Sequence, residues 1–265
     1  MSKIGFIGTG VMGSALARAV SKNEKDIMLS NVPSAAAKVL AEELGAHSAE
    51  NKTIAESCEY IVLAVKPQVI FSVLEEIAPV LKSRKDDFVL ISIAAGVTIN
   101  SVKSAVGIDF PVIRLMPNTP VSVEKGVILC AFDGVKEKQK EEFFRMFSSA
   151  GLCDEIAEDK IDAAGALTGC GPAFAYIMMQ ALADGAVACG IDRKTATVYA
   201  EKTVAGAAEL ALLSGEHLEK LKDAVCSPAG STIEGVNILE NRSVRAAFAD
   251  AVKASYKRNK ELGKK

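Results

Sequence analysis

The chain has 265 residues, enough for two domains, and hydrophobic residues make up 49% of it, so a large core can be buried. With a formal net charge of −2, the protein has no positive electrostatic potential overall to attract nucleic acid or an anionic membrane, so neither is expected as a partner. The six cysteines form no CxxC pair and the two histidines have no clustered ligands, so no metal site is expected.

The chain carries no pattern typical of export. Its N-terminal segment becomes rich in glycine too early for a secretory signal. The longest uncharged run, residues 163–183, is interrupted by Gly165, Gly169 and Pro172, and the apolar piece after Pro172 ends at Asp184, short of the ~20 residues that a bilayer requires. We therefore expect a cytoplasmic protein.

In the first half of the chain, short apolar runs alternate with helical patterns. Strands are predicted at residues 3–7, 26–30, 60–65, 88–93, 111–116 and 127–132, and helices at residues 12–20, 34–44 and 68–81. Ser34 is the expected N-cap of the second helix, and Gly45 its C-terminal stop. This alternation predicts an α/β fold for residues 1–157, a Rossmann domain with a doubly wound, mainly parallel sheet.

Strand patterns stop after about residue 158, and the rest of the chain is predicted to be helical. The expected helices span residues 161–168, 172–189, 193–214, 218–225, 232–239 and 243–262. Those between residues 173 and 213 are rich in alanine and apolar on more than one face, more than a domain of about a hundred residues can bury alone. We therefore expect residues 158–265 to form an all-α dimerisation domain rather than a self-contained bundle.

The first predicted strand leads into IGFIGTGVMG, a GxGxxG motif that opens a helix. Gly8 permits a tight turn, Gly10 lets the backbone approach a pyrophosphate, and Gly13 lets the helix pack close to the strand. The free amides and the positive dipole end at the helix N-terminus then face the phosphates. The motif in this context predicts a dinucleotide cofactor.

The end of the second strand bears on which dinucleotide binds. NAD-binding proteins place a carboxylate there, whereas this chain has Ser30 and Asn31. Both can donate hydrogen bonds to a 2′-phosphate, so NADP(H) is favoured, with NAD(H) also possible because no arginine follows. The alternative is that Ser30 and Asn31 merely cap the next turn.

Further cofactor contacts are expected at the carboxyl ends of later strands, where doubly wound sheets bind ligands. The candidates are Ala64, Val65, Lys66 and Pro67 after one strand, Ile93, Ala94 and Ala95 after the next, and Asn118 within RLMPNTP. Small residues there would let the cofactor lie against the backbone. Lys66 could contact a phosphate or be simply solvated.

IGFIGTGVMG, LAVKP, ISIAAGVTI, IRLMPNTP, ALTGCGPAF and LKDAVCSPAGSTIEGVNILE occur in an order and spacing that resembles the pyrroline-5-carboxylate reductase family from end to end. The resemblance implies NAD(P)H-dependent reduction of the cyclic imine 1-pyrroline-5-carboxylate to L-proline. It also implies that Val11 and Met12 contact the cofactor in the first turn and that Asn51 lies near the adenosine. It further implies that Gly230, Ser231 and Thr232 bind substrate at a dimer interface, and that dimers assemble further, commonly to a decamer. Where some relatives carry a glutamate near the substrate, this chain has Gly215, to which no role is transferred.

The turn SPAGST, residues 227–232, contains no side chain that titrates near neutral pH. An imine substrate that brings its own carboxylate and is reduced by a cofactor requires amides for the carboxylate and a hydroxyl for the ring nitrogen. We expect the Thr232 hydroxyl to contact that nitrogen; the alternative is that Ser231 or Thr232 only caps the helix. Ala229 stands where many relatives have glycine, a mild change that a negative φ would accept.

Two other functions fit parts of the pattern. A β-hydroxyacid dehydrogenase would join the same two kinds of domain, but it requires a general base on a helix of the second domain, and residues 163–183 offer no ionisable side chain except Cys170 and Tyr176. A non-catalytic NADP-sensing protein would share the fold, although it has no evident need for the turn at Gly230.

Overall fold

The computed structural model of the protein describes residues 2–262 and comprises two compact units. The first unit contains residues 2–170 together with residues 255–262, and the second contains residues 171–254. Helix α7 (Glu158–Thr168), which follows the predicted boundary at residue 157, packs against strand β7 (Gly126–Asp133) of the first unit.

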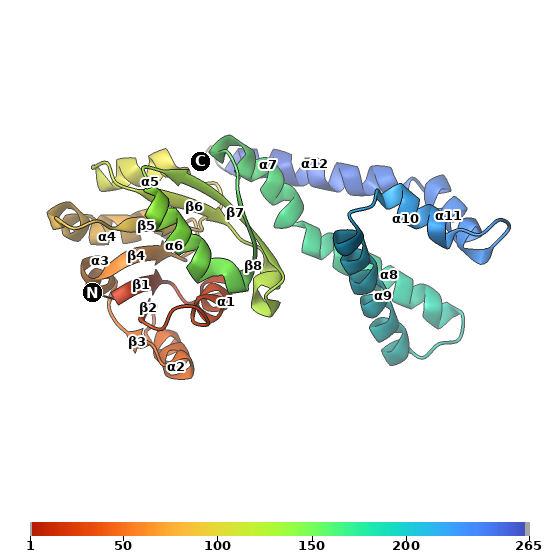
Figure 1. Ribbon diagram of the computed structural model, residues 1–265, viewed down its shortest axis with the longest axis horizontal. Helices are drawn as coiled ribbons and strands as arrows, with labels where there is room; N and C mark the ends of the chain where they lie inside the picture. The colour runs from red at the N-terminus through yellow and green to blue at the C-terminus, as the bar shows by residue number, and fades with distance from the viewer. Residues whose placement is uncertain (1, 263–265) are drawn as a thin grey trace. The chain divides into compact units, whose positions relative to one another are not determined.

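The first unit is built on one eight-stranded sheet, whose strands are seen among its helices in Figure 1. The spatial order is β3-β2-β1-β4-β5-β6-β7-β8, and every neighbouring pair is parallel except β6 and β7. Besides β7, the strands are β1 (Ser2–Ile7), β2 (Ile27–Ser30), β3 (His47–Ser48), β4 (Cys58–Leu63), β5 (Val89–Ser92), β6 (Val112–Met116) and β8 (Gly151–Glu155). The predicted doubly wound, mainly parallel sheet is confirmed.

Helices cover both faces of this sheet. Besides α7 they are α1 (Val11–Val20), α2 (Ala35–Leu44), α3 (Asn51–Ser57), α4 (Ile70–Ser83), α5 (Ile99–Val106) and α6 (Glu137–Phe147), with short 3₁₀ turns at Thr119–Val123 and Ser148–Ala150. One apolar layer includes Leu16, Leu40 and Phe143 of α1, α2 and α6, and the other includes Leu74 and Val102 of α4 and α5. The central strands are buried on both sides, which is why they appear in the sequence as continuous apolar runs.

Five elements of the first unit lie outside the predicted set: β3, α3, α5, α6 and β8. β3 and α3 are two and seven residues long, too short for a periodic pattern. Thr98 is the N-cap of α5, and its side chain accepts a hydrogen bond from the Ser101 amide at 3.1 Å. α6 is highly charged, and it is held by burial of Phe143 and Phe147 on one face.

The helices of the second unit agree closely with the predicted ones. They are α8 (Gly171–Ala188), α9 (Arg193–Ser214), α10 (Leu218–Val225), α11 (Ser231–Asn241) and the greater part of α12 (Val244–Leu262). α9 and α10 match their predicted bounds to the residue. Gly215 closes α9 in the left-handed conformation, with φ of 62°, so its place in the chain has a structural reason.

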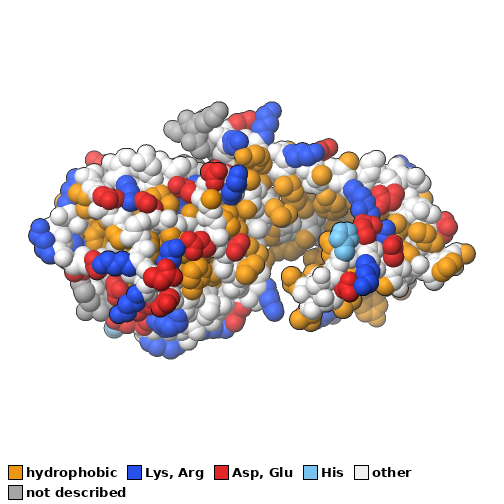
Figure 2. Space-filling view, turned by 45° about the horizontal axis from the view of Figure 1, so that its top comes forward, with side chains coloured by type: hydrophobic (Ala, Val, Ile, Leu, Met, Phe, Trp, Pro, Cys, Tyr) orange, Lys and Arg blue, Asp and Glu red, His pale blue; other side chains and the backbone are white. Residues whose placement is uncertain are grey.

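Little of this helical unit is buried within one chain. Its buried apolar residues are Ala183, Ala196 and Ala200, whereas Leu212 and Leu213 are 84% and 81% exposed. Figure 2 shows hydrophobic side chains gathered on the surface of these helices. This is the outcome expected for helices that are apolar nearly all round and lack a partner within the chain.

Residues 158–188 are, within the described chain, the one helical stretch long and apolar enough to cross a membrane by length and composition, and 11% of its apolar window is buried. A turn at Gly169 and Cys170 separates it into α7 and α8, as the glycines of this run predict.

Candidate functional site

The glycine-rich turn between β1 and α1 has the geometry that its spacing predicts. Gly8 has a φ of 105°, and a Cβ on it would lie 2.6 Å from the Ala64 carbonyl oxygen. A Cβ on Gly13 would lie 2.2 Å from the Gly8 carbonyl oxygen, so only glycine lets the helix approach the turn. A Cβ on Gly10 would meet nothing within 4 Å, because this glycine faces open space. Gly8 and Gly13 therefore serve packing, and Gly10 keeps the approach to the helix free.

The first turn of α1 presents unsatisfied donors at this opening. Gly10 is the N-cap and accepts from the Ser14 amide at 2.8 Å, while no side chain caps the helix. The amides of Val11, Met12 and Gly13 thus have no partner within the helix. A cavity of about 620 Å³ opens here, lined in part by Gly10, Val11 and Ser14.

Thr9 supplies an independent test of whether an anion fits this turn. The residue is 7% exposed, yet its hydroxyl oxygen is buried without a hydrogen-bond partner among the described residues. A buried, unpaired hydroxyl is costly, and a bound phosphate oxygen would give it a partner. Together with the free amides and the dipole of α1, this shows that the turn suits a pyrophosphate.

The carboxyl ends of β4 and β5 lie beside the same turn. The Ala64 amide donates to the Ile7 carbonyl at 2.8 Å, and the Ile93 amide donates to the Leu63 carbonyl at 3.2 Å. The predicted residues Ala64, Val65, Lys66, Pro67, Ile93, Ala94 and Ala95 are therefore brought together at one edge of the sheet. Pro67 and Ala95 line a cavity of about 570 Å³, and Lys66 is exposed.

Ser30 and Asn31, at the end of β2, are hydrogen-bonded within the chain. The Ser30 hydroxyl donates to Asn51 Oδ1 at 2.6 Å, and Asn51 Nδ2 donates to Glu76 Oε2 at 2.8 Å. Asn31 Oδ1 accepts from the Thr9 amide at 3.0 Å, and its Nδ2 donates to the Pro33 carbonyl at 3.1 Å. The Ser30 proton, counted from the sequence as available to a 2′-phosphate, is therefore already engaged.

Glu76 is the member of this group that sequence reasoning missed. It lies on the exposed face of α4, in no motif and 25 residues from Asn51 in the sequence. Only the packing of α4 beside α3 brings the two side chains together.

Asn118 has a structural task in this fold. It is 7% exposed, its Nδ2 donates to the Thr168 carbonyl at 3.0 Å, and its Oδ1 accepts from the Val127 amide at 2.9 Å. Its amide therefore joins the start of β7 to the end of α7, which leaves one Nδ2 proton for any cofactor contact.

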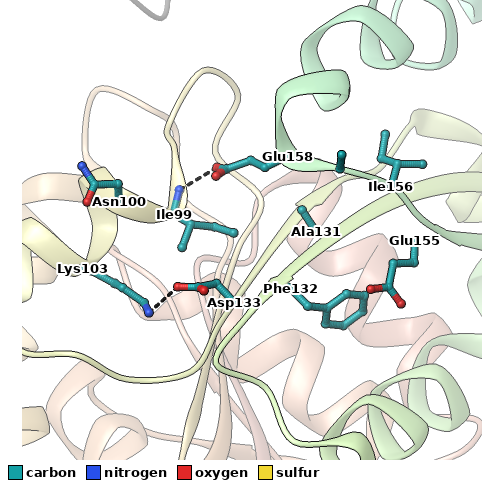
Figure 3. A pocket seen from close by; sticks show the side chains of 10 residues that line it. Ile99, Asn100, Lys103, Ala131, Phe132, Asp133, Glu155, Ile156 and Glu158 are labelled. Carbon is teal, nitrogen blue, oxygen red and sulfur yellow. Dashed lines mark hydrogen bonds and ion pairs between the residues drawn. The ribbon is translucent and has the colours of Figure 1, made fainter.

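Another cavity, of about 490 Å³, lies over β7 between α5 and the start of α7 (Figure 3). Lys103 forms ion pairs with Asp109 and Asp133 at its edge, and Glu158 accepts from the Ile99 amide at 2.7 Å. None of the residues predicted from the sequence lines it, and its charged side chains are paired: Lys103 with Asp133, Glu155 with Lys140 and Glu158 with Arg114.

The second predicted site, the turn before α11, differs in detail from its expectation. Gly230 is the N-cap of α11, without a side-chain cap, so Ser231 and Thr232 stand inside the first turn and the alternative that one of them caps the helix is wrong. The Gly230 amide donates to the Ser227 carbonyl at 3.0 Å, so it is engaged. Among the described residues, the Ser231 and Thr232 amides have no acceptor.

Two conformations in this turn depend on residue size. A Cβ on Gly230 would lie 2.3 Å from Ser227 Oγ, so glycine keeps the turn tight. Ala229 has a φ of 57°, so the negative φ that would make its substitution for glycine mild is not adopted. Ala229 immediately precedes the N-cap Gly230, where the chain changes direction to enter α11. Its backbone lies in the left-handed region that favours glycine.

An ion-pair network joins the helices around this turn. Arg245 of α12 contacts Glu219 of α10 at 2.7 Å and Glu240 of α11 at 2.6 Å. The Arg245 guanidinium, and then the Lys222 ammonium, lower the pKa of Glu219 from 4.5 to about 2. All three side chains are well exposed, so each ion pair is individually weak. Through Arg245, the two pairs connect α12 to both α10 and α11.

Comparison with known proteins gives matches to both parts of the chain. A family model described as pyrroline-5-carboxylate reductase dimerisation matches residues 158–262, and one described as NADP oxidoreductase, coenzyme F420-dependent, matches residues 3–96.

Full-length relatives are also found. The chain is 40% identical over 269 residues to a pyrroline-5-carboxylate reductase of Methanosarcina acetivorans, covering 99% of this chain and 98% of the relative. The crystal structure of Plasmodium falciparum pyrroline carboxylate reductase with NADP bound superimposes with a TM-score of 0.87 at 32% identity, over 99% of this chain and 98% of that one. A pyrroline-5-carboxylate reductase structure from Coxiella burnetii gives a TM-score of 0.91 at 33% identity, over 98% of both chains. The chain belongs to the pyrroline-5-carboxylate reductase family.

Proposed function

We propose that this protein reduces 1-pyrroline-5-carboxylate to L-proline with NADPH or NADH, the last step of proline biosynthesis. The observation that carries the proposal is the pairing of a dinucleotide turn at Gly8–Gly13 with an uncapped helix start at Gly230–Thr232 that holds free amides and no acid or base. A β-hydroxyacid dehydrogenase would require a general base on a helix of the second domain, where residues 163–183 offer no ionisable side chain except Cys170 and Tyr176.

The cofactor, when bound, supplies the hydride to the imine carbon. We assign its pyrophosphate to the turn and first helical residues Gly8, Gly10, Val11, Met12 and Gly13. The adenosine end is assigned to Ser30, Asn31 and Asn51. The nicotinamide end is assigned to Ala64, Val65, Lys66, Pro67, Ile93, Ala94 and Ala95, with Asn118 contributing its remaining proton.

We assign the substrate carboxylate to the start of α11. The free amides of Ser231 and Thr232, at the positive end of the helix dipole, favour an anion, and Gly230 allows close approach of the backbone. The Thr232 hydroxyl is assigned to the ring nitrogen, which it orients and to which it relays a proton. Because a protonated imine is already electrophilic, no strong acid is required.

The active assembly is proposed to be a homo-oligomer. Residues 158–265 are assigned as the dimerisation and substrate-binding domain, following a Rossmann domain of residues 1–157. The exposed apolar side chains of α8 and α9 would then be covered by a second copy, with dimers assembling to a decamer in the cytoplasm. We propose neither a membrane nor nucleic acid as a partner, in keeping with the net charge of −2.

A spectrophotometric assay tests the reaction. Purified protein is mixed with NADPH, or separately NADH, and oxidation of the cofactor is followed after addition of 1-pyrroline-5-carboxylate, with proline identified as the product. Imine-dependent oxidation that yields proline supports the proposal. Binding of the cofactor without any turnover would favour a sensing protein, and turnover of a β-hydroxyacid with NADP⁺ instead would favour the dehydrogenase.

A further inference from the structure

Ser30, Asn51 and Glu76 form a three-member hydrogen-bond relay. The Ser30 hydroxyl donates to Asn51 Oδ1 at 2.6 Å, and Asn51 Nδ2 donates to Glu76 Oε2 at 2.8 Å. Ser30 is 4% exposed and Asn51 is half-buried, so the bond between them is shielded from water, whereas Glu76 lies at the exposed end of the relay.

The carboxylate at one end sets the direction of the whole relay. As a carboxylate, Glu76 can only accept, so Asn51 must turn its NH₂ group toward it. The amide oxygen of Asn51 then faces Ser30, and the single hydroxyl proton of Ser30 must point to that oxygen. Ser30 is left with lone pairs alone, able to accept a hydrogen bond but not to donate one.

The relay stands where the adenosine ribose of a bound dinucleotide lies. Ser30 is the last residue of β2, about 20 residues after the glycine-rich turn, which is the place where doubly wound sheets contact the 2′ position of the ribose. Its neighbour Asn31 accepts from the Thr9 amide at 3.0 Å, which ties this strand end to the pyrophosphate turn. An acceptor at this place suits a ribose hydroxyl, which can donate, and does not suit a phosphate, which can only accept.

We propose that Glu76 determines cofactor specificity: acting through Asn51, it orients the Ser30 hydroxyl as an acceptor and so weakens the preference of this site for NADP(H) over NAD(H). Glu76 is a positioning residue here, because it acts on the cofactor through two other side chains. The inference rests on the proposed use of both cofactors.

The isosteric substitution Glu76→Gln would allow the relay to reverse. A glutamine at position 76 can donate to Asn51 Oδ1, so Asn51 can donate to Ser30 and release the Ser30 proton toward a 2′-phosphate. We expect the ratio of NADP⁺ to NAD⁺ affinity, measured by isothermal titration calorimetry on the full chain, to rise about tenfold. Adding Ser30→Ala to Glu76→Gln should abolish that gain, because the released proton is then absent.

Glu75→Gln is the matched control. Glu75 is the neighbouring exposed residue on α4 and takes no part in the relay, so this variant removes the same charge and should leave the ratio within about twofold of the wild type. The proposal is overturned if Glu76→Gln leaves the ratio unchanged, if Glu75→Gln raises it equally, or if the gain survives Ser30→Ala. The binding ratio is measured without turnover. A shifted ratio in a chain that does not reduce the imine would therefore refute only the proposed reaction, and an unshifted ratio in an active enzyme would refute only this inference.

Discussion

Arg114 on β6 donates through Nη2 to Oδ1 of Asp162 on α7 across 2.6 Å, and 4% of the Arg114 side chain is exposed. Glu158, one turn earlier on α7, lies 3.4 Å from the same guanidinium. The buried cation thus holds α7 at the end of the sheet, where Asp162 lines the same cavity as Pro67 and Ala95.

Asp162→Asn should destabilise the protein, because it leaves the buried guanidinium with Glu158, at 3.4 Å, as its one carboxylate partner among the described residues. A hydrogen bond to a charged group contributes about 1.5–3 kcal/mol, and we expect the free energy of unfolding in urea to fall by about that amount. Asp159→Asn on the same helix is the control, since Asp159 is 72% exposed and its change should stay within about 0.5 kcal/mol. Equal effects of the two variants would contradict the role given to Arg114.

Gly10→Ala and Gly13→Ala should separate cofactor binding from folding. The alanine at position 10 has open space and a φ of −68°, so the melting temperature should be nearly unchanged while the Kd for NADP⁺ rises at least tenfold, because the Cβ stands where the pyrophosphate approaches. The alanine at position 13 would lie 2.2 Å from the Gly8 oxygen and should lower the melting temperature sharply. Thermal scans with cofactor titrations decide this, and a Gly10→Ala protein that binds NADP⁺ normally would refute the site.

Ala229→Gly should stabilise the protein. Ala229 has a φ of 57°, a conformation that costs an L-residue roughly 1–2 kcal/mol. Glycine removes most of that cost, although its greater conformational entropy in the unfolded chain offsets part of the gain. We expect a rise in melting temperature. Ala224→Gly, in the helical part of α10, should instead lower it, since about 0.5–1 kcal/mol of helix propensity is lost. If the two substitutions acted in the same direction, Ala229 would not be strained.

Thr232→Ala should reduce kcat/KM for the imine by about 30- to 150-fold, equivalent to about 2–3 kcal/mol of transition-state stabilisation. Since Gly230 is the N-cap, no loss of capping accompanies the change, and the melting temperature should hold. Thr232→Ser keeps the hydroxyl and should retain most of the activity. An unchanged kcat/KM in Thr232→Ala would remove Thr232 from the mechanism.

Acid should loosen the contact between α10, α11 and α12. The pKa of Glu219 is lowered in the folded state to about 2, chiefly by Arg245, so its contribution to stability is complete above its unfolded pKa of about 4.3 and is lost as the pH falls toward 2. The difference in melting temperature between the wild type and Glu219→Gln should therefore shrink between pH 4.5 and 2. It should also shrink in 1 M NaCl at neutral pH, because these exposed charges are screened. A difference as large at pH 2 as at pH 4.5 would exclude the ion pairs as its source.

The sequence by itself determined the α/β fold, the glycine-rich turn and the helical character of the second half. The fold and the helices follow from local hydrophobic periodicity, and the turn follows from the spacing of its glycines. α9 and α10 were predicted to the residue, since Asp192 and Gly215 mark the bounds of α9 by local backbone chemistry. Short or charged elements such as α3 and α6 were not predicted, because their stability comes from packing against the sheet rather than from their own hydrophobic pattern.

Only the tertiary structure decided how the polar side chains at the cofactor end are used. In the sequence, nothing distinguishes Glu76 from other glutamates. In the fold, α4 packs beside α3 and brings Glu76 within hydrogen-bond distance of Asn51, which then fixes the direction of the Ser30 hydroxyl proton. Asn118 is hydrogen-bonded to the backbone of Thr168 and Val127, contacts that its sequence position does not reveal. A hydrogen bond is satisfied by whichever partner the fold brings near, and for these residues the partners lie 9 to 50 positions away along the chain, where no local pattern records them.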